Sequence, residues 1–171
     1  VCGTQHVIQG ALRLPDIPAG TAGLYINQCA ANQVSSVNLT PRTGLGATQT
    51  LEELILDDTT MTSPPNVSAY INLNRLSISG IQTNGALTSL PNINQLVNLK
   101  YLDLSRQQGI TMIPDGYFDN NVLLEEILLK NNAITALPVG RFDDDCSINA
   151  CSILKVLNLR GNKIEALTSV N

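Results

Sequence analysis

The sequence predicts a repeat solenoid, in which a curved parallel β-sheet forms the concave face and short helical or irregular segments return along the convex face. Of the 171 residues 43% are hydrophobic but only 4% aromatic, and 25 Leu and 15 Ile supply most of the apolar side chains. Only 14% are charged, where about 25% is usual for a soluble domain, and 18 Asn add polarity. The third observation is a spacing of Leu, Ile and Asn that recurs along the chain.

The clearest copies of this spacing are LLEEILLKNNAITALP at residues 123–138 and ILKVLNLRGNKIEAL at residues 153–167. When Leu124 and Leu154 are taken as position 1, both units carry Leu or Ile at positions 1, 4, 6 and 11 and Asn at position 9. Earlier units begin at Thr21, Leu51, Leu73 and Leu99. Because units of 20 to 50 residues that agree in phase indicate stacked coils, we expect about six coils over residues 21–171.

The two ends of such a stack expose its core, so caps are expected. Residues 1–20, which contain Pro15 and Pro18, are predicted to form an amino-terminal cap. No carboxy-terminal cap is evident after the last unit, and the chain is expected to be a fragment of a longer ectodomain or to stack on a partner through this edge. Because it begins with Val1 and has no apolar signal stretch, it is expected to be a processed or excised product.

Positions 4 and 6 are predicted to point into the core, because side chains alternate along a strand. Positions 3, 5 and 7 then point outward and form the predicted partner-binding surface. Tyr101, Leu128 and Val156 are expected to form one apolar patch, and Tyr25 and Ile55 a second, although ordinary strand propensity also explains these residue types. The complete predicted surface is Tyr25, Ile55, Asp57, Tyr101, Asp103, Leu128, Lys130, Val156, Asn158 and Arg160.

Asn at position 9 suits a turn in which its amide bonds the backbone of adjoining coils. Asn132 and Asn162 are therefore interpreted as structural. The resulting pattern LxxLxLxxNxI resembles the leucine-rich repeat family over roughly residues 21–171, although Thr21, Cys29, Thr59, Ile81 and Gln107 replace the expected Leu or Asn. Pro and Phe recur at matching places in two successive units, as Pro114 and Phe118 and as Pro138 and Phe142. This recurrence resembles the typical type of extracellular eukaryotic members, and the two Phe are predicted to form a spine on the return side.

This resemblance extends to a Cys-bearing amino-terminal cap, which implies a Cys2–Cys29 disulfide; the alternative is that Cys29 is a buried thiol in place of Asn. Coils spaced about 4.8 Å apart separate these cysteines from Cys146 and Cys151, which are expected to bridge each other or to remain free thiols. A zinc site would need four converging ligands, so no metal is predicted. Two bridges would imply an oxidising compartment.

Two N-glycosylation sequons, at Asn38 and Asn66, fall outside the predicted strands, in return segments. They agree with a secreted or cell-surface, extracellular protein. No enzyme and no cofactor is predicted, because the single His6 has no recognisable nucleophile partner. A pI near 4.8 and dispersed basic residues argue against nucleic acid, and no apolar stretch approaches the roughly 20 residues of a membrane helix.

We therefore expect an extracellular module that binds a protein or a glycan-bearing macromolecule through its concave face. The alternative is a structural subunit of a filament, coat or matrix that assembles through the repeat edges, including the open carboxy-terminal one. Acidic runs such as Asp143, Asp144 and Asp145 are interpreted as solvated loops, because the spaced pattern of a calcium loop is absent.

Overall fold

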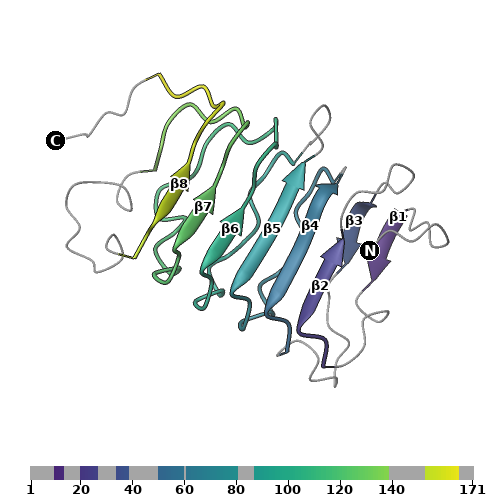
Figure 1. The fold of residues 1–171 in the computed structure, drawn as a ribbon. Helices are drawn as coiled ribbons and strands as arrows, with labels where there is room; N and C mark the ends of the chain where they lie inside the picture. Colours follow the sequence, from purple (N-terminus) through teal and green to yellow (C-terminus); the bar gives the residue numbers. More distant parts are fainter. Residues whose placement is uncertain are drawn as a thin grey trace.

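The computed structural model describes residues 10–13, 20–26, 34–38, 50–59, 61–80, 87–138 and 153–165. Its main feature is a six-stranded parallel sheet whose strands follow one another in chain order (Figure 1). The strands are β2 (Gly23–Ile26), β4 (Glu53–Thr59), β5 (Arg75–Gly80), β6 (Tyr101–Asp103), β7 (Glu126–Leu128) and β8 (Val156–Asn158). A parallel β-sheet solenoid is therefore confirmed, with its strands at the predicted places.

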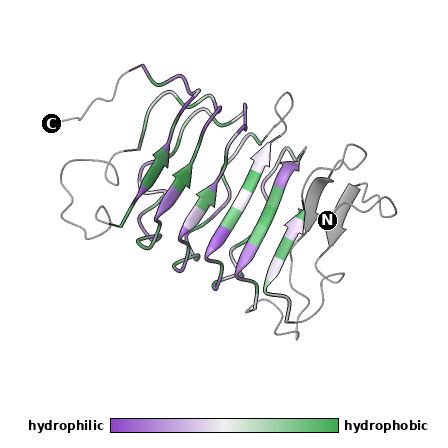
Figure 2. Cartoon of the chain, viewed as in Figure 1, coloured by the Kyte–Doolittle hydropathy of each residue, from purple (hydrophilic) through white to green (hydrophobic). Residues whose placement is uncertain are grey.

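The register of the sheet matches the predicted positions strand by strand. Leu54 of β4 lies opposite Leu24 of β2 and Leu76 of β5, and the same column continues through Leu102 and Ile127 to Leu157. The four central members of this column are fully buried. In Figure 2 the hydrophobic residues of β4 lie between hydrophilic residues at its two ends. Position 4 thus forms one continuous aliphatic ladder through the core.

A repeated backbone contact at position 2 fixes the phase of neighbouring coils. The Glu52 carbonyl accepts hydrogen bonds from the N–H groups of Asn74, at 2.8 Å, and Arg75, at 3.1 Å. The same double acceptance occurs at the four equivalent carbonyls, those of Ala22, Asn74, Lys100 and Glu125. Each coil therefore joins the next in the same way, although the coils differ in length.

No helix occurs in the described return segments, which consist of consecutive turns. In the coil after β4, the Tyr70 N–H donates to the Val67 carbonyl and the Leu73 N–H to the Tyr70 carbonyl. The same bonds recur at residues 93, 96 and 99 and at residues 118, 121 and 124. The first residues of these turns, Val67, Ile93 and Phe118, are buried and close the core opposite the strands.

Phe118 has the predicted spine role, because it is 1% exposed and packs edge-to-face on Tyr117 with ring centroids 4.9 Å apart. Tyr117 in turn donates its hydroxyl to the Pro91 carbonyl at 2.7 Å. Phe142 lies outside the described residues.

A second, two-stranded parallel sheet was not expected from the repeat pattern. It pairs β1 (Gly10–Arg13) with β3 (Val34–Asn38), so a segment of the predicted cap pairs with the chain that follows β2. The prediction of a return segment around Asn38 is corrected here, because Asn38 is the last residue of a strand and lies opposite Arg13. The segment VSSVN contains two β-branched Val, and pairing gives its backbone groups partners.

Candidate functional site

The outward positions of the large sheet form the columns that the repeat alignment predicts. Position 5 runs from Tyr25 through Ile55, Ser77, Asp103 and Leu128 to Asn158. Tyr25 is 51% exposed and Val156, in the position 3 column, 40%. Most of the other described outward residues are partly exposed, but Ser77, Ser79 and Ser105 are buried, and Arg160 is exposed. The face opposite the Leu ladder therefore presents side chains to solvent.

The apolar residues expected on β6, β7 and β8 are separated by polar neighbours. Glu126 lies between Tyr101 and Val156 in the position 3 column, and Leu128 lies between two polar residues in the position 5 column. The Arg75 guanidinium carbon lies 3.6 Å from the centroid of the Tyr101 ring, a cation–π contact. The face is thus a mixture of aromatic, aliphatic and charged groups instead of one apolar patch.

Tyr25 and Ile55, the second predicted pair, are direct cross-strand neighbours. The Tyr25 ring lies so close to Gly23 that a Cβ there would be 2.6 Å from a ring carbon. The Tyr25 hydroxyl donates a hydrogen bond to the Glu53 carboxylate. This bond is the main cause that raises the pKa of Tyr25 above its ordinary value.

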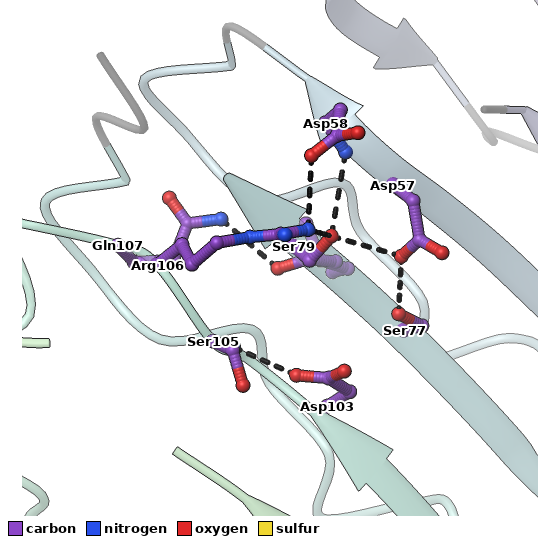
Figure 3. A network of polar contacts seen from close by, with 9 residues as sticks. Asp57, Asp58, Ser77, Ser79, Asp103, Ser105, Arg106 and Gln107 are labelled. Atoms are coloured by element: carbon purple, nitrogen blue, oxygen red, sulfur yellow. Dashed lines mark hydrogen bonds and ion pairs between the residues drawn. The ribbon is translucent and has the colours of Figure 1, made fainter. Parts of the chain in front are cut away.

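A polar network joins the ends of β4, β5 and the turn after β6 (Figure 3). The Asp57 carboxylate accepts hydrogen bonds from the hydroxyls of Ser77, at 2.6 Å, and Ser79, at 3.0 Å. The Arg106 Nη2 lies 2.9 Å from both Ser79 Oγ and Asp58 Oδ1. Because Ser77 and Ser79 are nearly inaccessible, Asp57 satisfies internal hydroxyl groups and is only partly available to a partner.

Position 8 has a repeated left-handed backbone conformation. Asp58, Arg106 and Asn131 have φ of 54°, 62° and 56°, and Gly161 has 77°. Non-Gly residues with φ of this sign are uncommon, so their recurrence marks a similar backbone turn in four of the units. Gly80, at position 8 of the unit that contains β5, does not share this conformation.

Asp103 and Asn158 cap this turn. The Asp103 carboxylate accepts the Ser105 N–H at 2.9 Å, and the Asn158 amide oxygen accepts the Arg160 N–H at 3.2 Å. A side-chain oxygen that bonds the backbone two residues ahead is typical of Asx turns. Two residues that the sequence assigns to partner binding therefore also hold the ends of their own strands.

The structural role of Asn at position 9 is confirmed. Asn132 donates to the carbonyls of Leu104 and Leu129 at 3.0 and 3.1 Å and accepts the Gln107 N–H at 2.6 Å. Asn162 donates to the carbonyls of Leu129 and Leu159 at 2.7 and 2.8 Å. Each amide thus supplies partners to carbonyl groups of its own coil and of the preceding coil.

Gln107 continues this series although it is one methylene longer than Asn. Its Nε2 donates to the Ile78 carbonyl at 2.9 Å, and its Oε1 accepts the Leu87 N–H at 3.1 Å. Its coil has one extra residue before Ile110. Gly109 lies in this segment and is so close to the Leu87 carbonyl that a Cβ on it would be 2.4 Å from the carbonyl oxygen.

Lys130 and Arg160, the basic members of the predicted surface, lie just beyond β7 and β8. They line an open polar pocket together with Arg106 and Lys163. This pocket was not foreseen, because Arg106 and Lys163 come from positions 8 and 10, outside the outward columns. The signal in the sequence that indicates this pocket is the recurrence of basic residues at positions 7 to 10 of successive units.

Several predicted sites concern parts of the chain that the structure does not describe. Cys2, Cys29, Cys146 and Cys151 all lie outside the described residues, so the disulfides stay predictions. Asn66 is exposed in a return segment, and its side-chain oxygen accepts the N–H and hydroxyl of Ser68 at 3.1 and 2.8 Å.

Neither a metal-binding cluster nor a membrane-spanning helix is present within the described ranges. No group of three or more His, Cys, Asp and Glu side chains is arranged there to hold a metal ion. The same residues include no helical segment with the length and hydrophobicity of a bilayer crossing. Comparisons with models of known protein families and with curated proteins found no match.

Proposed function

We propose that the chain is an extracellular, non-enzymatic recognition module of the leucine-rich repeat type, which binds a protein or a glycan-bearing macromolecule through the outward face of its large sheet. The observation that carries the proposal is the contrast between the two faces of one parallel sheet. Leu54, Leu76, Leu102 and Ile127 are fully buried on one face. The opposite face presents Tyr, Ile, Leu, Val, Glu and Arg side chains at one residue per coil in each column.

This mixture suits recognition of a macromolecule. Aromatic and Arg side chains provide most of the binding energy in many protein interfaces, and Tyr25, Tyr101 and Arg75 all occur on this face. The backbone that carries them is joined from coil to coil by repeated hydrogen bonds. A rigid surface loses little conformational entropy on association.

The leucine-rich repeat type is supported by three features that coincide in the last three units, which begin at Leu99, Leu124 and Leu154. These are a short strand at positions 3 to 5, a left-handed turn at position 8 and an amide side chain at position 9 that bonds the preceding coil. The extracellular location is supported by the cysteine pattern and by the exposed sequon at Asn66.

Two matched valines test the proposed binding face. Val156 on the sheet face is 40% exposed and Val122 on a return turn is 39% exposed. A multimerised form of the chain would be screened against an array of extracellular glycans and a panel of secreted and cell-surface proteins. For any partner found, Val156→Glu should weaken binding at least about tenfold, because it introduces an unpaired charge into the interface, whereas Val122→Glu should leave binding unchanged.

Equal loss of binding in the two variants, or no loss in either, would refute the sheet face as the binding surface. Thermal unfolding of both proteins is the control, since each substitution replaces a partly exposed Val and should alter stability to the same degree.

A further inference from the structure

The strands β6, β7 and β8 end at an open pocket with a volume of about 690 Å3. Four cationic residues from three successive coils line it: Arg106, Lys130, Arg160 and Lys163. The chain has only ten Lys and Arg and a net charge of −4, so this concentration of positive charge does not follow from a generally basic surface. No carboxylate is among the described residues that line the pocket.

The positive charge of this pocket is only partly compensated. Arg106 forms an ion pair with Asp58, with 2.9 Å between Nη2 and Oδ1, and the same nitrogen contacts a Ser hydroxyl. Within the described ranges, Lys130, Arg160 and Lys163 make no ion pair with a carboxylate. Three positive charges are therefore available to a ligand, and Arg106 is held in place beside them.

The repeat geometry brings these charges together. Lys130 and Arg160 occupy position 7 of neighbouring coils, whose strands are about 4.8 Å apart. Lys163 follows at position 10 of the last described coil. At Gly161, between Arg160 and Lys163, the pocket wall is bare backbone with φ of 77°. Guanidinium and ammonium groups that converge from adjacent coils match the oxygens of a tetrahedral anion, and Arg can bind two of them.

We infer that this pocket binds a sulfate or phosphate monoester group carried by the macromolecular partner, an inference that rests on the proposed function. Near neutral pH a phosphate monoester is largely a dianion, which neutralises two of the three available cations. A sulfate ester is a monoanion like a carboxylate, but it presents three oxygens to the converging donors instead of two. The volume lies within the range of small-molecule sites and leaves room for the sugar ring or side chain that bears the anion. Amide groups of Gln108 and Asn131 on the wall supply neutral hydrogen-bonding partners.

The distribution of charge along the strand ends favours a discrete group over an extended polyanion. Asp57 and Asp58 lie in the last part of β4, whereas Lys130 and Arg160 follow β7 and β8. A sulfated polysaccharide or an RNA strand that ran along the whole row would meet these carboxylates at the far end. Repulsion there would limit binding to the three coils of the pocket.

The test uses simple anions and the backbone amides that line the pocket. Sodium sulfate, inorganic phosphate, phenyl sulfate and phenyl phosphate are titrated at constant ionic strength, and the NMR shifts of the Asn131 and Gly161 amides are followed. Saturable shifts are expected, with the aryl esters at least as tight as the free anions, and the ratio of sulfate to phosphate esters identifies the preferred source.

The double variant Lys130→Gln/Arg160→Gln should weaken anion binding at least about tenfold, because it removes two charge-assisted hydrogen bonds. The control Lys100→Gln/Lys155→Gln changes the net charge equally, at exposed residues that do not line the pocket, and should weaken binding less than about twofold. Equal effects in the two double variants, or shifts that do not saturate, would overturn the inference. The inference would also be overturned if heparin or RNA bound more tightly than the simple anions and the control variant lost that binding as well.

This result is separable from the test of the sheet face. If simple anions do not bind while Val156→Glu abolishes partner binding, the pocket inference fails and the proposed function stands. If the anions bind and the variants behave as expected while no macromolecular partner is found, the proposed function fails and the anion site stands.

Discussion

The amide side chains at position 9 lead to a prediction about energetic coupling between coils. Replacing Asn132 with Ala removes three hydrogen bonds, but the Leu129 carbonyl keeps a second donor in Asn162, at 2.7 Å. The Leu104 carbonyl and the Gln107 N–H lose the hydrogen-bond partner that Asn132 gives them. A buried polar group left without a partner costs about 1–3 kcal/mol, so Asn132→Ala should destabilise the protein by roughly 3 kcal/mol.

For a domain of this size, that loss corresponds to a melting temperature lower by roughly 6–12 °C. Asn162→Ala should cost less, because Asn162 is partly exposed and water replaces some of its bonds. In the double variant the Leu129 carbonyl loses both donors. The combined destabilisation should therefore exceed the sum of the single effects by about 1 kcal/mol.

The assay is a double-mutant cycle measured by urea and thermal unfolding, with Asn120→Ala as control. Asn120 is exposed on a turn, and its replacement should change stability by less than about 0.5 kcal/mol. If the effects of Asn132→Ala and Asn162→Ala add within about 0.3 kcal/mol, the shared carbonyl does not couple the two coils and the reasoning is refuted.

Three further predictions concern other parts of the chain. Gly109→Ala should destabilise by about 1–3 kcal/mol, because its Cβ would be 2.4 Å from the Leu87 carbonyl oxygen; a denaturation midpoint equal to that of Gln108→Ala would contradict this. Burial raises the pKa of Tyr70 to about 12 from 10, so the contribution of Tyr70 to stability should be constant below pH 10 and fall between pH 10 and 12. Burial also raises the pKa of Tyr117, so Tyr70→Phe should reduce, without abolishing, the loss of stability between pH 9 and 11.5 in unfolding experiments; an unchanged loss would contradict this. Mass spectrometry under non-reducing conditions should find two disulfides, Cys2–Cys29 and Cys146–Cys151. A disulfide between a cysteine of the first pair and one of the second would contradict the separation of the coils.

The strands and their register could be predicted from the sequence because of a strong physical constraint. A slip of one residue would turn Leu54, Leu76 and Leu102 from the core to solvent, and no other alignment buries all of them. The role of Asn132 followed from the same phase, since a buried turn between strands leaves carbonyl groups that need a donor.

Other features depend on residues that only the fold brings together. The sequence placed Asp57 on the outward face. Its hydrogen bonds with the hydroxyls of Ser77 and Ser79, however, depend on how closely the end of β5 approaches β4. The pocket required positions 7, 8 and 10 of different coils to converge, and the left-handed turn that aims Arg106 has no distinct residue type in the sequence. β1 precedes the first unit and β3 follows the eleven patterned positions of that unit, so the pattern could not predict this sheet.

The direction of the amide bonds has a consequence for the order in which the chain acquires structure during synthesis. Asn162 reaches the Leu129 carbonyl, Asn132 the Leu104 carbonyl, and Gln107 the Ile78 carbonyl, so each amide bonds the coil made just before it. A coil that has just emerged from the ribosome therefore has a carbonyl group without its amide donor until the next coil has been synthesised. Coils should therefore fold in order from the amino end, each one after the following coil has been synthesised. If translation paused after residue 104, the Leu104 carbonyl would lack its Asn132 donor until synthesis resumed.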